Sequence, residues 1–438
     1  MESTIFSTVE PSSASQGRGS REPRESLDGG TLKRRRVEGM RQKTTLLDLI
    51  QSEQFGPANH ALTSMLDTKD KLSVMQTSSA YRQGMKNTVW NINKRLLRFF
   101  ENPLTFRSQL GKCDALISGS FALQFFEGVL WKESDLDIFV ESGNNTEAME
   151  KYLLEVAYTH TGSWSRPDHD RMEEYSNIKG IVECRTYHDS NPNGYGAKVQ
   201  IISTKESPVR AILEGFYTTC IVNFITWNKA YSLFPKATFL IHQTIPLVDT
   251  SIYLGKLYTK YSKRGWPMWT HPLGQESYSK LFANNGEAES NRERRIGDST
   301  TWIMKLDTTS VARLEKPDSV LEYSSYNISM GHGTDHHRCT IYAAPFQSNA
   351  LRYRYLRSNW LYELAPIFER ATEMQLFKLK ESDQQRLQHR VRNHLGLWTK
   401  IFDKPDGWDY LDEQLPHYFA ELKENPGLLR DLGYEPRY

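Results

Sequence analysis

Apolar positions change from strand-like to helical spacing through the first half of the chain. Residues 116–117 end a short apolar run, and residues 121–130, FALQFFEGVL, carry apolar side chains at helical spacing. The stretch 134–141, SDLDIFVE, then alternates between polar and apolar residues, as a strand does. This pattern predicts a strand–helix–strand unit over residues 114–141.

The pattern on either side of this unit predicts an α+β protein. Turn residues in 188–197, HDSNPNGYGA, separate two strand-like runs and indicate a hairpin, so we expect a mixed sheet. The sequence predicts strands over 178–187, 197–203 and 299–307, and helices over 72–101, 146–159, 208–232, 348–379, 383–402 and 409–424. The last three helices predict a mainly helical C-terminal region.

Basic residues follow the predicted helix 72–101 on the side away from its apolar stripe. They are Lys86, Lys94, Arg95 and Arg98. Such residues are typical of a solvated helix face, and they can also hold phosphates or an acceptor molecule. The sequence leaves both interpretations open.

Two aspartates and a Gly-Ser turn carry the candidate chemistry. On the predicted strand 134–141, Asp135 and Asp137 point to the same face, about 6.5–7 Å apart along the chain, and they repel each other unless a cation lies between them. Mg²⁺ is held by one or two protein carboxylates together with phosphate oxygens and water. Gly119 and Ser120 open the preceding helix, whose free N–H groups suit a phosphate. These parts predict a site for a metal-bound nucleoside triphosphate, although an Asp-x-Asp alone is often a solvated strand edge.

Gly119-Ser120 followed by Asp135-x-Asp137 resembles the signature of the DNA polymerase beta-like nucleotidyltransferase superfamily. The wider stretch ISGSFALQFF…ESDLDIFVE is similar to a group of fungal proteins built on that fold, which lends no function of its own. The stretches 198–239 and KYSKRGW at 260–266 continue this resemblance, which covers roughly residues 80–310.

The resemblance implies a nucleotidyltransferase that uses Mg²⁺ or Mn²⁺. Asp135 and Asp137 would be catalytic and metal ligands, and Gly119 and Ser120 would contact the phosphates. Lys198 lies two residues before Gln200, so on a strand it shares a face with Gln200. If Gln200 faces the metal ions, the Lys198 ammonium contacts phosphate; otherwise it points into water.

The third carboxylate of the superfamily pattern is missing from its expected place. The strand KVQII carries Gln200 there, and a glutamine brings no charge and cannot act as a general base. Three interpretations remain. The protein works with two aspartates; Glu183 in GIVECRTY takes the third place, if its strand lies beside Asp137; or the site binds without catalysing.

Composition limits the class of protein. The chain has 438 residues, of which 38% are hydrophobic and 25% charged, with 12% aromatic residues, and it contains no run long enough to span a membrane. Its four cysteines form no CxxC pair, which favours a cytoplasmic or nuclear location. A net charge of +2 gives no support for a nucleic-acid acceptor and does not exclude one.

We expect four segments along the chain. Residues 1–42 are a disordered basic tail in which Lys33–Arg36 is a candidate nuclear localisation signal or a loose electrostatic arm. Residues 43–110 are helices that pack on the core, 111–310 the nucleotidyltransferase-like domain, and 311–438 the mainly helical region.

The main hypothesis is metal-dependent nucleotidyl transfer from a nucleoside triphosphate to a hydroxyl of a nucleic acid, a protein or a small molecule. The alternative is a catalytically degenerate protein of the same fold that acts as a nucleotide-binding or protein-interaction module.

Overall fold

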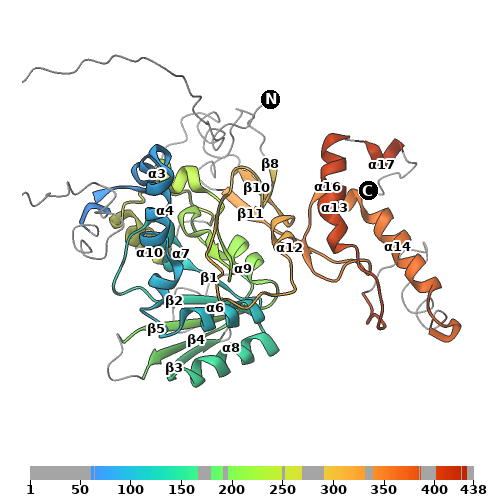
Figure 1. Ribbon diagram of the computed structural model, residues 1–438, viewed down its shortest axis with the longest axis horizontal. Helices are drawn as coiled ribbons and strands as arrows, with labels where there is room; N and C mark the ends of the chain where they lie inside the picture. The colour runs from blue at the N-terminus through green and yellow to red at the C-terminus, as the bar shows by residue number, and fades with distance from the viewer. Residues whose placement is uncertain are drawn as a thin grey trace, which may run out of the picture.

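A mixed eight-stranded sheet forms the centre of the molecule (Figure 1). The computed structural model describes residues 61–165, 179–190, 196–248, 252–268, 291–330, 339–385 and 401–431, except residues 64, 384 and 426. The strand order is β3-β4-β5-β2-β1-β6-β7-β9. The bounds are β1 Leu116–Ser118, β2 Leu136–Glu141, β3 Tyr158–Ser165, β4 Ile181–Asp189, β5 Lys198–Thr204, β6 Asn223–Ile225, β7 Lys229–Ser232 and β9 Trp302–Lys305. Strands β2 and β5 pair in parallel and the neighbouring pairs are antiparallel, which confirms the α+β class with a mixed sheet.

The predicted strand–helix–strand unit lies in the middle of this sheet. Helix α7, Gly119–Glu127, follows β1 directly, and every one of its residues is buried because it runs through the hydrophobic core. Gly128 ends the helix in the left-handed conformation, with φ of 72°, and its N–H donates to the Gln124 carbonyl at 2.9 Å. The chain then returns as β2, antiparallel to β1, so that Ser118 lies opposite Asp137.

The sheet places the predicted hairpin next to β2. Strands β4 and β5 pair antiparallel, as the turn residues between them predict, and β5 pairs with β2 on its other side. Gln200 therefore lies between Asp137 on β2 and Thr186 on β4. Because side chains alternate between the faces of a strand, these three side chains point to one face of the sheet.

Helix α8, Asn144–Glu155, covers the other face of β2 and β5. The Thr146 hydroxyl on α8 lies 3.3 Å from the Ser203 hydroxyl on β5, and Arg185 on β4 forms an ion pair with Glu150 on α8. The neighbouring α6, Pro103–Lys112, packs against α8. The predicted helix 146–159 is thus present, but it ends earlier because β3 begins at Tyr158.

The single helix predicted over 72–101 is wrong. The chain forms three helices instead, α3 Thr68–Thr77, α4 Ser79–Thr88 and α5 Ile92–Leu96. The Ser78 hydroxyl accepts a hydrogen bond from the Ala80 N–H at 3.1 Å, and the Asn91 side chain accepts one from the Lys94 N–H at 3.0 Å. Each is an N-cap, which starts a new helix and interrupts the apolar stripe.

The helix predicted over 208–232 is correct only in its first part. Helix α9 spans Pro208–Gly215, a short 3-10 turn spans Thr219–Ile221, and β6 and β7 follow. Strand β6 lies between β1 and β7, and its Asn223 carbonyl accepts a hydrogen bond from the Ser118 hydroxyl at 2.6 Å. Tertiary pairing in the middle of the sheet therefore overrides a pattern that reads as helical.

A smaller sheet and a helical region complete the fold (Figure 1). Its strands are β8 Asn291–Arg295, β10 Ser325–Met330 and β11 Cys339–Tyr342. Strands β12 Pro345–Phe346 and β13 Tyr355–Leu356 then pair, and the helices α13 Asn359–Glu363, α14 Ala365–Phe377, α16 Leu415–Glu424 and α17 Leu428–Asp431 follow. This confirms a mainly helical C-terminal region, but the helix predicted over 348–379 is interrupted by β13, and most of 383–402 lies outside the described residues.

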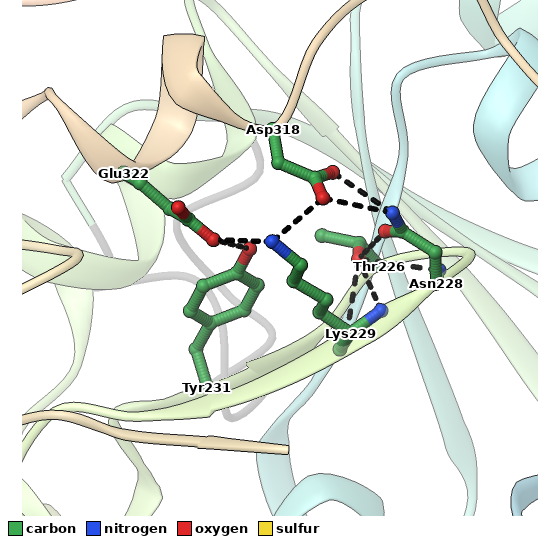
Figure 2. Close-up of polar contacts among 6 residues, drawn as sticks. All are labelled: Thr226, Asn228, Lys229, Tyr231, Asp318 and Glu322. Atoms are coloured by element: carbon green, nitrogen blue, oxygen red, sulfur yellow. Dashed lines mark hydrogen bonds and ion pairs between the residues drawn. The ribbon is translucent and has the colours of Figure 1, made fainter. Parts of the chain in front are cut away.

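A polar network joins the central sheet to α12, Ser319–Glu322, which precedes β10 (Figure 2). The Lys229 ammonium on β7 lies 2.7 Å from an Asp318 oxygen and 2.6 Å from a Glu322 oxygen. Asn228 donates to both Asp318 oxygens at 2.9 and 3.0 Å, and the Tyr231 hydroxyl donates to Glu322 at 3.1 Å. These contacts fasten the chain that leads to the C-terminal region onto the edge of the sheet.

Candidate functional site

The Gly-Ser turn and the two aspartates line one cleft at the end of β1 and the start of β2. Its empty volume, counted out to the open mouth, is about 640 Å³, within the usual range for small-molecule sites. The lining residues are Gly119, Ser120, Glu133, Ser134, Asp135, Asp137, Gln200, Phe216, Tyr217, Ile221, Lys260, Tyr261 and Arg264. The structure thus brings together residues from four separate stretches of the chain.

Gly119 is required where α7 begins. Its φ is 66°, and a Cβ atom at this position would lie 2.3 Å from Oδ2 of Asp137. A side chain therefore meets both a strained backbone and the carboxylate of the site. The residue before it, Ser118, makes no side-chain cap for α7, because its hydroxyl bonds to Asn223 across the sheet.

Asp135 is neutralised by Lys198. The ammonium lies 2.9 Å from Oδ2 of Asp135, and both side chains are about one-third exposed, at 34% and 31%. Burial alone would lower the pKa of Lys198, but the hydrogen bond and negative charge of Asp135, with a smaller contribution from Asp137, raise it. Lys198 therefore stays protonated beside the cleft and occupies one oxygen of Asp135.

Asp137 is far less exposed than Asp135. Its residue exposure is 4%, and its carboxylate lies against Gly119 at the start of α7. The next strand places Gln200 directly alongside it, and the Gln200 amide donates to the Thr186 hydroxyl at 3.4 Å. The position expected to hold a third carboxylate thus continues into an uncharged polar strip on β5 and β4.

Glu183 does not join the aspartates. Its strand β4 is separated from β2 by β5, and Glu183 lies opposite Ser203, which faces α8. Its carboxylate lies 2.8 Å from Arg185, which also pairs with Glu150 on α8. Glu183 therefore belongs to the far face of the sheet, and the condition for its being a third ligand is not met.

Two arginines and a glutamine hold the loop that leads into β2. Arg95 donates to the Val129 carbonyl at 2.8 Å, and Arg98 donates to the Trp131 carbonyl at 2.9 Å and to the Ser134 carbonyl. Both arginines are half-buried, so the solvated-face interpretation is wrong for them, whereas Lys86 and Lys94 are exposed.

Gln124, which is buried on α7, binds the same loop from the other side. Its amide oxygen accepts from the Trp131 N–H at 2.6 Å, and its amide nitrogen donates to the Ser134 hydroxyl at 2.6 Å. The predicted turn between helix and strand is therefore a fixed structure, and Asp135 follows it directly.

Helix α10, Ile252–Lys263, supplies cationic and aromatic residues that the sequence interpretation did not assign to the site. Lys260, Tyr261 and Arg264 all line the cleft. The Arg264 guanidinium carbon lies 4.1 Å from the ring centroid of Trp131, and its buried Nη1 has no hydrogen-bond partner among the described residues. The signal for these residues was the stretch KYSKRGW, which the resemblance had included without assigning roles.

The donor set of the cleft fits a magnesium or manganese ion that arrives with a ligand. Within the described ranges, no group of three or more His, Cys, Asp or Glu side chains is placed to hold a metal ion. Two carboxylates and one amide oxygen suit an ion that takes its remaining ligands from phosphate and water, which is the usual way in which Mg²⁺ binds.

Comparison with known proteins adds little to this picture. No family model matches the chain, and no curated protein matches it in sequence. Among solved structures, one of a CCA-adding enzyme in apo form I is similar over 44% of each chain, with 13% identity and a TM-score of 0.29. A likeness at that level carries no argument about function. No helix in the described part of the chain is long and apolar enough to cross a membrane.

Proposed function

We propose that the protein transfers a nucleotidyl group from a nucleoside triphosphate to a hydroxyl acceptor, with Mg²⁺ or Mn²⁺. One observation carries this proposal: Asp135 and Asp137 line the same cleft as the start of α7 and the cations of α10. Carboxylates that can hold a divalent cation and groups that can hold phosphate are thus combined in one cavity of nucleotide size.

The cationic groups are positioned to bind the triphosphate. Arg264 presents a buried N–H group with no partner among the described residues, and Lys260 lines the same wall. Arginine and lysine donors form strong charge-assisted hydrogen bonds with phosphate oxygens. Gly119 allows a phosphate to approach the backbone N–H groups at the start of α7, because no Cβ intervenes.

Asp135 and Asp137 would hold the metal ion. When bound, the ion supplies positive charge to the phosphate oxygens and lowers the pKa of a coordinated hydroxyl. Lys198 lies next to Asp135, from which its ammonium can turn to a phosphate oxygen once Asp135 binds a cation. The acceptor oxygen then attacks the α-phosphorus, and pyrophosphate leaves.

Calorimetric binding of each nucleoside triphosphate, with Mg²⁺ and then Mn²⁺, tests the site. We expect metal-dependent binding by the wild type and its loss in Asp135→Ala/Asp137→Ala. A matched control is Glu147→Ala/Glu155→Ala, which removes two exposed carboxylates from α8 on the far face of the sheet. A folded wild type that binds no nucleoside triphosphate would refute the proposed function.

Transfer itself is measured as pyrophosphate release. Three acceptor classes are offered separately: an RNA oligonucleotide, a protein mixture and a polyol such as glycerol. The net charge of the chain does not select among them. Labelled product in one class, absent from the double variant, identifies the acceptor class.

The second candidate is a protein that binds the nucleotide without transferring it. Gln200 favours this candidate, because it places an uncharged amide beside Asp137. Here the wild type binds nucleotide and releases no pyrophosphate, whereas Gln200→Asp tightens metal binding or creates slow release. Release by the wild type that is unchanged in Gln200→Asp would reject the candidate.

A further inference from the structure

The proposed transfer requires a group that accepts the proton of the acceptor hydroxyl. As the oxygen attacks phosphorus, that proton must leave, and a positioned carboxylate or imidazole is the usual recipient. Gln200, at the place beside Asp137, has an amide that cannot take it. The base must therefore come from elsewhere in the cleft.

The two aspartates are poorly suited to this task. Asp135 is engaged by the Lys198 ammonium at 2.9 Å, and Asp137 is 4% exposed with one oxygen against Gly119. Both are also the groups that fit the cation. A carboxylate that holds a cation or an ammonium is a weak base, because its negative charge is already stabilised.

We propose that Glu133 is the general base that deprotonates the acceptor hydroxyl, an inference that rests on the proposed function. Glu133 lines the same cleft as Asp135, Asp137 and Gln200. Its side chain is exposed, and within the described part of the chain its carboxylate makes no hydrogen bond or ion pair. It is thus the carboxylate of the cleft that can accept a proton without first losing a partner.

Glu133 is placed for proton transfer rather than for metal binding. It does not form a metal-holding group of three with Asp135 and Asp137 among the described residues. A carboxylate in the cleft but outside the ligand group can reach the acceptor side of the reaction while the two aspartates hold the cation.

The backbone around Glu133 is fixed, as a catalytic base requires. Lys132 and Glu133 form the tip of a turn in which the Ser134 N–H donates to the Trp131 carbonyl at 3.1 Å. Both ends of that turn are held by Arg98 and Gln124. The turn therefore presents the Glu133 side chain from a constant position.

The step balances as follows. The acceptor O–H proton passes to a Glu133 oxygen while the acceptor oxygen forms a bond to the α-phosphorus. The bond between the α-phosphorus and the bridging oxygen breaks, and pyrophosphate leaves with that electron pair. Glu133 then gives its proton to water.

The variants Glu133→Gln and Glu133→Asp test this role, with Glu147→Gln as the matched control on an exposed helix face. The full chain is assayed for pyrophosphate release with MgATP, MgGTP, MgCTP and MgUTP and with each of the three acceptor classes. Loss of a general base lowers such rates by about 10²- to 10⁴-fold. We expect that loss in Glu133→Gln, partial activity in Glu133→Asp and the wild-type rate in the control.

Two further measurements separate a base from a structural residue. Calorimetric affinity for the metal-bound nucleotide should stay within about threefold of wild type in Glu133→Gln, because the base contacts the acceptor. The pH–rate profile of Glu133→Gln should lose the acidic limb that the wild type shows. Rescue by the shorter carboxylate of Glu133→Asp should restore that limb.

Each contrary outcome has a distinct meaning. Wild-type release by Glu133→Gln would overturn the inference and leave the proposed function standing, and equal loss of nucleotide affinity and rate would make Glu133 a binding residue. A wild type that binds nucleotide but releases no pyrophosphate with any acceptor would overturn both the base and the transfer. A wild type that binds no nucleotide would refute the site as a whole.

Discussion

Replacement of Lys198 by methionine separates the two roles that the structure suggests for this residue. In the structure its ammonium lies 2.9 Å from Asp135 and stands where a cation would otherwise draw the carboxylate. In the proposed complex it turns to a phosphate oxygen. The variant should therefore bind Mn²⁺ alone more tightly than the wild type, and metal-bound nucleotide more weakly.

The expected size follows from the exposure of the pair. At 2.9 Å and an effective dielectric constant of 20, Coulomb attraction between unit charges is about 6 kcal/mol. Both partners are one-third exposed, so solvent screening and desolvation cancel most of it, and measured values for such pairs are about 0.5–1 kcal/mol. Because 1.4 kcal/mol corresponds to a tenfold change in affinity, removal of the competing ammonium should tighten Mn²⁺ binding about 2- to 5-fold.

Calorimetric titration of Mn²⁺, with and without a nucleoside triphosphate, measures both effects on the same samples. Lys305→Met, at an exposed lysine of the edge strand β9, controls for loss of one positive charge. Equal or weaker Mn²⁺ binding by Lys198→Met would refute competition between the ammonium and the metal. Unchanged affinity for the metal-bound nucleotide would refute the phosphate contact.

Three other substitutions probe the support of the site. Gly119→Ala should abolish nucleotide binding and lower the free energy of unfolding in urea by at least about 1–2 kcal/mol, because φ is 66° and the new Cβ meets the Asp137 carboxylate; wild-type binding would refute this. Arg98→Met should lower that free energy by about 2 kcal/mol, since two loop carbonyls lose a charged donor, whereas Lys94→Met should not; equal values would contradict it. In His242, the hydrogen bond to its carboxylate partner raises the pKa above 6.5 in the folded state, so its contribution is complete below pH 6.5 and is lost as pH rises through the raised pKa. His242→Gln should therefore lose more stability at pH 5.5 than at pH 8.5 in thermal unfolding, and a loss independent of pH would contradict the ion pair.

Short-range pattern was sufficient for the centre of the fold. The turn after β1 needs a glycine, α7 needs apolar residues at helical spacing, and β2 needs alternation, so each element was predictable from neighbours within about ten residues. The hairpin of β4 and β5 was equally predictable, because turn formers separate two β-rich runs. The pairing of Asp137 with Gln200 then required only that these strands lie side by side.

The pattern failed where distant segments compete for the same residues. Residues 216–232 read as a helix, yet their backbone completes the sheet between β1 and β9, because unpaired strand edges in a core are costly. Residues 72–101 read as one helix, yet Ser78 and Asn91 start new ones. A cap is visible in sequence only when the helix on both sides has already been divided.

The amino-acid sequence by itself therefore determined the local parts of the site: Gly119 and Ser120 at the turn, and Asp135 and Asp137 on one strand face. Only the tertiary structure decided which distant groups join them. It excluded Glu183 by placing it on the far face of the sheet, and it brought Arg264 across from α10. The physical reason is range: alternation and helical periodicity act over a few residues, whereas the far wall of a cleft depends on how elements pack, which no local pattern encodes.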